Sequence, residues 1–276
     1  MSVRRLLEGA TETLTQAGVD SPRVDAELLL SHVIGMPRAT LLFAAHISDA
    51  QRSTYRDMIA ARARRVPLQH ITGRAAFRYV DLEVGPGVFV PRPETEVLAG
   101  WAIDEALRRE SPVVVELCAG SGAISLSIVH EAPQSRVHAV ELDERAFAWA
   151  QNNLDGTGVD LRLGDMAEAF TDLNGLVDIV VANPPYIPLE AWESVSQEVR
   201  DHDPALALWS GDDGLDAMRV VEQVAWRLLK PGGVVGAEHA DVQGASAPEV
   251  FLDRWSAVRD HRDLADKPRF VTAERP

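Results

Sequence analysis

The second half of the chain alternates short apolar runs with longer stretches of helical pattern, and no other feature constrains the fold as strongly. The apolar runs indicate buried strands at 113–117, 137–140, 161–163, 176–182 and 234–237. Helical stretches lie at 123–132, 144–154 and 215–229. Strands that alternate with helices predict an α/β fold, in which a mostly parallel sheet carries helices on both faces. We expect further edge strands near the C-terminus, around residues 269–272.

The chain before this alternation has a different pattern. Apolar residues recur at helical spacing in the first 70 residues, where Ser21-Pro22 and the capping box Ser48-Asp49-Ala50-Gln51 are helix-start signals. Residues 77–90 alternate as strands do, on either side of a Gly85-Pro86-Gly87 turn. We therefore predict three parts: a helical domain over 1–74, a β-hairpin linker over 75–91 and an α/β domain over 92–276.

Composition places the protein among ordinary globular chains. It is 46% hydrophobic and 25% charged over 276 residues, and no apolar run approaches the ~20 residues of a membrane span. The N-terminus lacks a signal-peptide core, so we expect a cytoplasmic protein. Cys118 is the single cysteine and is expected to pack as a small apolar residue; together with histidines that share no ligand spacing, it predicts no metal site.

Charge is distributed unevenly. Residues 1–80 carry 11 Arg or Lys and 7 Asp or Glu, a net charge of +4, whereas residues 81–276 carry 16 against 35, a net charge of −19. An acidic surface repels a phosphate backbone, so we expect no direct nucleic-acid contact by the larger part. The basic part can touch nucleic acid or an acidic protein. For Arg62, Arg64 and Arg65 the plainer interpretation is a solvated helix end.

The tetrapeptide Asn183-Pro184-Pro185-Tyr186 follows the apolar run at 176–182. Two prolines cannot continue a ladder, so Asn183 lies where a central strand ends, at the rim where open α/β sheets bind ligands. Its side chain offers one acceptor and two donors, Pro184 a carbonyl, and Tyr186 an aromatic face. These groups can hold a planar amide or amine. A turn that merely ends a strand explains the tetrapeptide equally well.

Three earlier strand ends also carry polar or glycine-rich groups. The loop Cys118-Ala119-Gly120-Ser121-Gly122 lets a ligand approach the backbone closely, although it lacks the full spacing of a dinucleotide loop. Glu141 ends the second strand, where an acid accepts hydrogen bonds from ribose hydroxyls. At the third, Asp165 can meet the amino group of an adenine and Met166 can lie on its face. This recurrence favours a nucleoside-containing ligand.

These residues carry a resemblance. Glu116–Ile124, with Glu141 and Asp165, resembles the cofactor site of class I S-adenosylmethionine-dependent methyltransferases. Asn183–Tyr186 resembles the motif of amino-methyltransferases that act on adenine or glutamine nitrogen. Further segments are similar to signatures of the peptide chain release factor glutamine methyltransferases, and the resemblance spans the chain: Pro67–Gly73, Phe89–Glu96, Asp203–Leu208 and Asp213–Leu215.

The resemblance implies a fold and an activity. It implies a Rossmann-like methyltransferase domain preceded by a small helical domain that docks the substrate protein. The activity would be methyl transfer from S-adenosylmethionine to the side-chain amide nitrogen of the glutamine in the Gly-Gly-Gln motif of class 1 release factors. S-adenosylhomocysteine would be the product, and neither a metal nor a membrane would be involved.

The resemblance also implies residue roles. Asn183 and Pro184 would be catalytic, and with Pro185 and Tyr186 they would bind the glutamine. The cofactor would contact Cys118, Ala119, Gly120, Ser121, Gly122, Glu141, Asp165, Met166 and Asn183. Cys118 and Ala119 stand where the family often has glycine and threonine, and Met166 where an aromatic residue is common. We expect these departures to change cofactor affinity and to leave the activity intact.

Two other functions remain alternatives at this point. One is adenine N6 methylation of DNA or RNA, which the acidic balance of residues 81–276 and the absence of an added base-recognition domain disfavour. The other is a non-catalytic protein that binds the ribosome or a release factor and keeps a vestigial cofactor fold. The intact tetrapeptide and both acids, Glu141 and Asp165, disfavour that interpretation.

Overall fold

A computed structural model describes residues 2–44 and 46–276. The chain divides into two compact units. A helical unit comprises Met1–Arg74 and the distant segment Ser196–His202, and a larger unit comprises Ala75–Val195 and Asp203–Pro276. The predicted α/β range 92–276 thus includes a short segment, Ser196–His202, that belongs to the helical unit.

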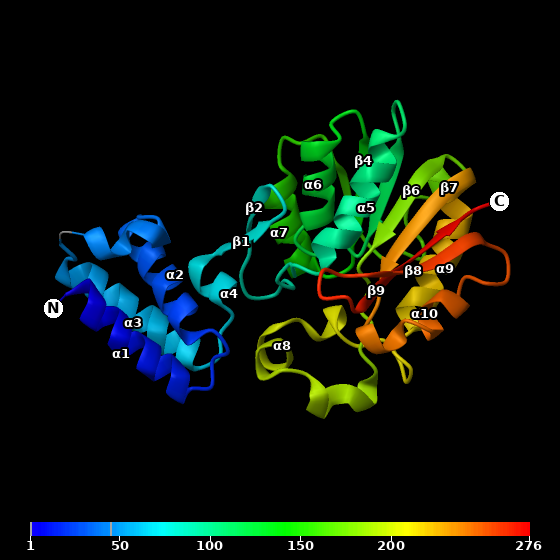
Figure 1. Ribbon diagram of the computed structural model, residues 1–276. Coiled ribbons are helices and arrows are strands. Elements are labelled where there is room, and N and C mark those ends of the chain that lie inside the picture. Colours follow the sequence, from blue (N-terminus) through cyan, green and yellow to red (C-terminus); the bar gives the residue numbers. More distant parts are fainter. Residues whose placement is uncertain (1, 45) are drawn as a thin grey trace. The chain divides into compact units, whose positions relative to one another are not determined.

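In the helical unit, helices α1, α2 and α3 pack against one another around one apolar core (Figure 1). Ser48 caps α3, and the reciprocal bonds with Gln51 form the predicted capping box. Tyr55 is fully buried, and its hydroxyl donates to the Ala26 carbonyl at 3.0 Å. The elements are α1 (Val3–Gln16), α2 (Pro22–Ile34), the 3-10 helix η1 (Arg38–Phe43), α3 (Asp49–Ala63), α4 (Leu68–Thr72) and α8 (Gln197–His202).

A buried ion cluster joins Ser196–His202 to the rest of this unit. Arg62 is 5% exposed. Its Nε lies 2.7 Å from Asp25 Oδ2, and its Nη2 lies 2.7 Å from Glu198 Oε1. The interpretation of Arg62 as part of a solvated helix end is therefore wrong. The Arg62 side chain is buried because it bonds the Glu198 carboxylate, which lies 136 residues later in the sequence.

The larger unit contains a two-stranded hairpin and a seven-stranded sheet. Its strands are β1 (Arg74–Phe77), β2 (Val80–Glu83), β3 (Val113–Leu117), β4 (Arg136–Glu141), β5 (Asp160–Leu163), β6 (Val177–Ala182), β7 (Leu229–Glu238), β8 (Ser256–Arg262) and β9 (Pro268–Glu274). Its α-helices are α5 (Thr95–Leu107), α6 (Ala123–Glu131), α7 (Glu144–Leu154), α9 (Asp216–Leu228) and α10 (Ser246–Glu249). Short 3-10 helices complete it: η2 (Thr171–Leu173), η3 (Leu189–Ser194), η4 (Ala205–Ala207) and η5 (Asp241–Gln243).

The strand order is β5-β4-β3-β6-β7-β9-β8. The pairs among the first five strands are parallel, and β9 and β8 add antiparallel pairs. This confirms the predicted mostly parallel α/β fold. The C-terminal strand β9 is not an edge strand, because it pairs with β7 on one side and with β8 on the other. The polar residues of Ser256–Arg262 gave no apolar run by which that strand could be predicted.

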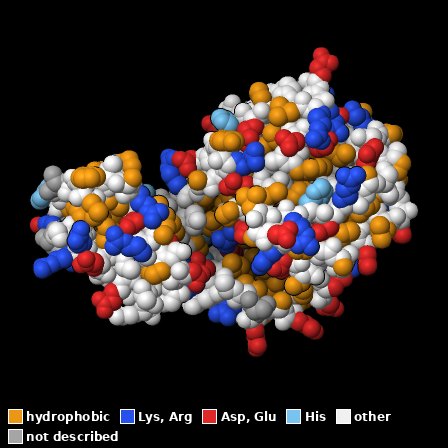
Figure 2. Space-filling view, viewed as in Figure 1, with side chains coloured by type: hydrophobic (Ala, Val, Ile, Leu, Met, Phe, Trp, Pro, Cys, Tyr) orange, Lys and Arg blue, Asp and Glu red, His pale blue; other side chains and the backbone are white. Residues whose placement is uncertain are grey.

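Both faces of the sheet are covered, as the near-continuous apolar strands require. Side chains alternate along each strand, so Val115 and Val180 face α9 and α10, whereas Val114 and Ile179 face α5 and α6. Figure 1 shows α5 and α6 in front of the central strands. On the face seen in Figure 2, acidic and basic side chains are interspersed over the larger unit.

The hairpin turns at a different place from the one predicted. Its strands meet at Arg78-Tyr79, not at Gly85-Pro86-Gly87. Arg78 adopts φ +50°, and its guanidinium makes two bonds of 2.7 Å to the Glu131 carboxylate, which hold this left-handed residue in place. Gly85 packs so closely on Trp149 that a Cβ would lie 2.6 Å from the ring. The predicted turn at Gly85-Pro86-Gly87 is present, since the Val88 amide donates to the Gly85 carbonyl at 3.4 Å, but it follows β2 and does not join the strands of the hairpin.

Candidate active site

Four parallel strands end side by side at one edge of the sheet. Leu117 of β3 pairs with Val140 of β4 and with Ala182 of β6, and Glu141 pairs with Leu163 of β5. The residues that follow these strands therefore meet at one rim, as expected for ligand sites of open α/β sheets.

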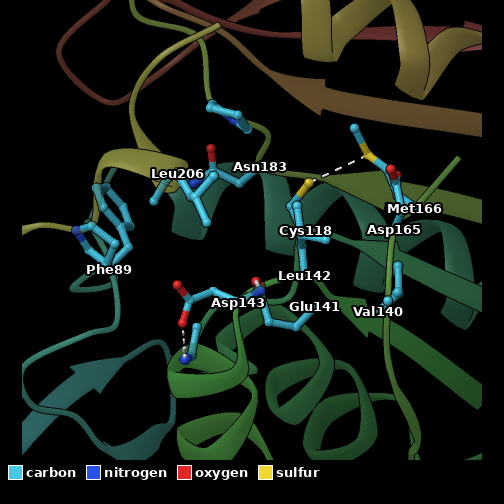
Figure 3. Close-up of a pocket in the computed structure, with 16 residues that line it drawn as sticks. Phe89, Cys118, Val140, Glu141, Leu142, Asp143, Asp165, Met166, Asn183 and Leu206 are labelled. Carbon is cyan, nitrogen blue, oxygen red and sulfur yellow. Dashed lines mark hydrogen bonds between the residues drawn. The ribbon is translucent and has the colours of Figure 1, made fainter.

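A pocket opens at this rim, with about 810 Å³ of space when the part open to solvent is included. Figure 3 shows Phe89 at one side of the pocket and Cys118 with Met166 at the other. The lining residues are Phe89, Cys118, Gly120, Val140, Glu141, Leu142, Asp143, Ala146, Gly164, Asp165, Met166, Asn183, Pro185, Pro204, Leu206 and Ala207.

Seven of the predicted site residues line this pocket: Cys118, Gly120, Glu141, Asp165, Met166, Asn183 and Pro185. Five do not: Ala119, Ser121, Gly122, Pro184 and Tyr186. Phe89 is the aromatic residue that lines the pocket, although an aromatic face was expected there from Tyr186. The tyrosine hydroxyl instead donates to Glu238 Oε1 at 3.3 Å.

The loop after β3 is shaped for close approach. Cys118, Gly120 and Gly122 have φ angles of +60°, +56° and +81°. A Cβ at Gly120 would meet nothing within 4 Å, so a ligand can lie against this backbone, whereas one at Gly122 would lie 3.0 Å from Leu154. The first glycine opens the pocket, and the second lets α7 pack behind the loop.

Glu141 holds this loop as well as facing the pocket. Its Oε2 accepts from the Gly120 amide at 2.7 Å, and its Oε1 accepts from the Asp143 amide at 2.8 Å. Burial raises the pKa of Glu141, and these amide bonds oppose that rise. A carboxylate has about four acceptor positions, so acceptor capacity remains for ligand hydroxyls.

The other end of the pocket is apolar and sulfur-rich. Cys118 Sγ lies 3.6 Å from Met166 Sδ. Burial raises the pKa of the Cys118 thiol, followed by the negative charges of Glu141 and Glu116. The thiol therefore stays protonated and packs as a small apolar group, as expected from the sequence.

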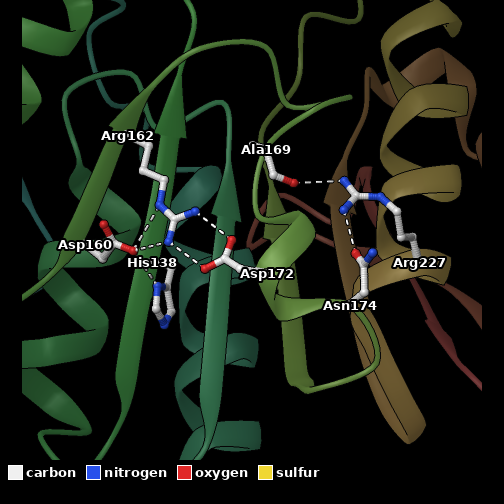
Figure 4. Close-up of polar contacts among 7 residues, drawn as sticks. All are labelled: His138, Asp160, Arg162, Ala169, Asp172, Asn174 and Arg227. Atoms are coloured by element: carbon white, nitrogen blue, oxygen red, sulfur yellow. Dashed lines mark hydrogen bonds and ion pairs between the residues drawn. The ribbon is translucent and has the colours of Figure 1, made fainter.

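The strand before Asp165 is at the edge of the sheet and is anchored by side chains (Figure 4). Arg162 of β5 bonds Asp160 at 2.7 Å and Asp172 at 2.8 Å, and His138 reaches Asp160 at 2.9 Å. The hydrogen bond from Arg162 lowers the pKa of Asp160, with a further contribution from His138. Both ends of the segment 160–172 are thereby fixed on the edge of the sheet.

Two motifs from distant parts of the chain meet beside Asn183. Arg92 bonds Asp203 Oδ2 at 2.7 Å, and its guanidinium lies 5.0 Å from the centre of the Phe89 ring. This contact places Phe89 beside the segment that contributes Pro204 and Leu206. Neither Phe89 nor Leu206 was selected as a site residue. Both lie in the segments that carried the resemblance, which was the signal that could have identified them.

The side chain of Gln243 holds the backbone that follows Pro185 in place. Gln243 is 4% exposed, and its Nε2 donates to the carbonyls of Tyr186 and Asp213, both at 3.1 Å. Gly214 has φ +75°, and a Cβ there would lie 2.4 Å from the Tyr186 carbonyl oxygen. The segment Asp213–Leu215 therefore needs glycine at its centre because it passes directly against the tetrapeptide.

We expect Gly214→Ala to lower both stability and activity. Left-handed strain costs about 1 kcal/mol and overpacking about 1–3 kcal/mol, and the displaced Tyr186 backbone would misplace Asn183. Gly232→Ala is the matched control, because Gly232 has φ +76° and a Cβ added there would meet nothing within 4 Å. Urea unfolding and methyl-transfer rates measure both variants. Equal rates for the two would contradict the proposed contact.

The described residues set limits on other kinds of site. None of the helices in the described part is long and apolar enough to cross a membrane. Within residues 2–44 and 46–276, no group of three or more His, Cys, Asp or Glu side chains is placed to hold a metal ion.

Known proteins resemble both parts of the chain. The family described as PrmC N-terminal domain matches residues 5–73, and the family described as methyltransferase small domain matches residues 95–199. The release factor glutamine methyltransferase of Streptomyces coelicolor is 55% identical over 271 residues, 96% of this chain and 95% of the relative. That of Mycolicibacterium smegmatis is 44% identical over 277 residues, 99% of this chain and 98% of the relative.

A further relative is named for a different substrate. The 4-amino-L-phenylalanine/4-methylamino-L-phenylalanine methyltransferase of Streptomyces pristinaespiralis is 40% identical over 264 residues, 92% of this chain and 89% of the relative. Similar sequences thus occur in enzymes named for two different methyl acceptors. A test of the site therefore has to distinguish a release factor from a free amino acid as the acceptor.

Proposed function

The chain belongs to the release factor glutamine methyltransferase family, and from that membership we propose how its residues perform the reaction. The enzyme transfers a methyl group from S-adenosylmethionine to a release factor glutamine. We propose that the acceptor is the side-chain amide nitrogen of the glutamine in the Gly-Gly-Gln motif. The observation that carries this proposal is Asn183, which lines the pocket between the cofactor-facing residues and the wall of Phe89 and Leu206.

The rim residues fit S-adenosylmethionine. Gly120 leaves its backbone open to a ligand, and Glu141 keeps acceptor positions for ribose hydroxyls. We propose that Asp165 accepts from the adenine amino group and that Met166 lies against the adenine ring. S-adenosylmethionine, when bound, supplies the methyl group on a positively charged sulfur. The protein residues hold that methyl near Asn183 and exclude water from it.

Asn183 and Pro184 provide the proposed catalytic contacts. An amide nitrogen is a poor nucleophile, because its lone pair is delocalised into the carbonyl. The Asn183 side-chain oxygen and the Pro184 carbonyl would each accept one hydrogen of the glutamine NH2. These bonds orient the nitrogen and stabilise positive charge as it develops there. Alignment with the methyl group supplies much of the remaining rate enhancement. The extra proton on the methylated nitrogen is strongly acidic and passes to solvent during or after transfer, with neutral S-adenosylhomocysteine as the other product.

We propose that the helical unit docks the release factor. Residues 1–80 carry a net charge of +4, and η1 exposes Leu42 and Phe43 at 58% and 82%. Exposed apolar side chains together with basic charge favour a protein partner with an acidic surface. The −19 charge of residues 81–276 argues against an extended nucleic-acid contact in that part. A release factor substrate would place the enzyme's work in the cytoplasm.

Labelled S-adenosylmethionine tests the proposed acceptor. Parallel reactions contain release factor, the same factor with its Gly-Gly-Gln glutamine replaced, DNA, and 4-amino-L-phenylalanine. We expect label in the intact release factor alone. Label in DNA or in the free amine, with none in the release factor, would refute the proposed function.

A further inference from the structure

The Asn183 side chain has two ends of opposite chemistry, and only one of them suits the reaction. A substrate NH2 needs an acceptor, so the Asn183 oxygen must face it. A flipped side chain would present its own NH2 and repel the substrate. In the structure, Asn183 Nδ2 donates to Thr95 Oγ1 at 3.3 Å. The Thr95 hydroxyl therefore occupies the donor end of the amide and leaves the oxygen for the substrate.

The Thr95 hydroxyl in turn faces a buried carboxylate. Thr95 begins α5 and is 4% exposed, and Glu238 ends β7 and is 1% exposed. The Tyr186 hydroxyl donates to Glu238 Oε1 at 3.3 Å, whereas Glu238 Oε2 is buried and has no hydrogen-bond partner among the described residues. Burial raises the pKa of Glu238, and the Thr95 hydroxyl opposes that rise. Glu238 thus bonds Tyr186 directly and can reach Asn183 only through Thr95, without lining the pocket itself.

The direction of these bonds follows from the chemistry of Glu238. An ionised carboxylate only accepts hydrogen bonds. The Thr95 hydrogen is therefore the donor available to the unpartnered Glu238 Oε2, while the Thr95 oxygen accepts from Asn183. This order allows a single orientation of the Asn183 amide. We propose that Thr95 and Glu238 are positioning residues that set the orientation of the Asn183 side chain for methyl transfer. The proposal rests on the proposed role of Asn183.

Ionisation of Glu238 makes this arrangement sensitive to pH. Burial raises the pKa of Glu238 to about 7, against the opposing effects of Thr95, Arg269 and Tyr186, and Glu94 adds a further rise. Below that pH, Glu238 carries a proton and can donate to Thr95. Thr95 can then donate towards Asn183, and the single orientation is lost. We expect kcat to rise with pH through about 7.

Thr95→Val tests the relay, because valine keeps the shape and removes the hydroxyl. We expect kcat to fall about 10- to 100-fold, as for other residues that orient a reacting group, with the Kd for S-adenosylmethionine nearly unchanged. Thr95→Ser, which keeps the hydroxyl, should restore most of the rate. Thr272→Val is the matched control: Thr272 is 8% exposed, lies on β9 and bonds His261. We expect it to leave kcat unchanged.

Glu238→Gln tests the direction of the bonds. Its NH2 can donate to Thr95, so we expect a similar loss of kcat and the disappearance of the rise near pH 7. Glu222→Gln removes another buried carboxylate, which bonds Arg254 and Trp255. It should lower the melting temperature and keep the wild-type pH profile. A role of Glu238 in stability alone would make both variants behave alike.

A second readout is independent of turnover. The side-chain amide of Asn183 gives a pair of ¹H–¹⁵N NMR signals, assigned by their absence in Asn183→Ala. In the complex with S-adenosylhomocysteine these signals should shift with pH near 7 in the wild type and not in Glu238→Gln. An active wild-type enzyme with no such shift and full activity in Thr95→Val would overturn the relay. Failure of the wild type to methylate release factor would instead count against the proposed function.

Discussion

Asn183→Ala is expected to lower kcat for release factor methylation by about 100- to 1000-fold, the usual effect of removing one preorganised contact to developing charge. The substrate NH2 would lose the acceptor that orients it. Binding of S-adenosylmethionine should weaken by less than about 10-fold, because the loop at Gly120 and the Glu141 carboxylate are untouched. Single-turnover methylation gives the rate, and titration calorimetry gives the affinity.

Two further variants sharpen this result. Asn152→Ala changes an exposed asparagine of α7 and should leave the rate unchanged. Asn183→Asp keeps an acceptor but faces Thr95 with a second carboxylate beside Glu238, and one Thr95 hydrogen cannot serve both. We expect its rate to lie between those of the alanine variant and the wild type. Near-normal turnover by Asn183→Ala would show that the tetrapeptide only ends a strand.

Arg62→Ala is expected to lower the free energy of unfolding by about 3–5 kcal/mol, the range for breaking a buried ion pair. The Arg62 side chain is 7% exposed and contacts Asp25 and Glu198, whose side chains are 11% and 21% exposed. Alanine would leave the Asp25 carboxylate without its cation, while Glu198 would keep only Arg65, whose Nη2 lies 3.0 Å from Glu198 Oε1. The Arg62 Nη1 bond to the Val66 carbonyl at 3.0 Å would be lost as well.

Chemical unfolding of Arg62→Ala and Arg64→Ala measures this effect. Arg64 is an exposed residue two positions further along, so its replacement should change the free energy of unfolding by less than about 0.5 kcal/mol. If both variants unfold at the same urea concentration as the wild type, the cluster contributes no stability, and the segment Ser196–His202 must be held by other contacts.

Local rules predicted much of the fold. The capping box at Ser48 depends on residues three positions apart, and the strand Val113–Leu117 is apolar throughout apart from Glu116, so both are visible without tertiary information. The hairpin was misplaced because Arg78 is unusual at a left-handed turn and is stabilised by Glu131, which lies 53 residues away. Glycine and proline in Gly85-Pro86-Gly87 gave the stronger local signal.

The residues that line the pocket were largely predictable from the sequence, whereas the residues that support them from behind were not. Parallel strands bring their ends to one rim, so Cys118, Glu141, Asp165 and Asn183 were expected to meet there, and all four line the pocket. Thr95 and Glu238 were not identified. They are 143 positions apart in the sequence, and a threonine shortly after two prolines and a glutamate at a strand end have ordinary local explanations. Their role depends on tertiary contacts.

Tandem mass spectrometry of the methylated release factor tests the central claim most directly. The factor is incubated with S-adenosylmethionine and either the wild-type enzyme or Asn183→Ala, then digested and sequenced. The account predicts one added methyl group, on the side-chain nitrogen of the Gly-Gly-Gln glutamine, with the wild-type enzyme only. A methyl group on any other residue, or on that glutamine with both enzymes, would contradict it.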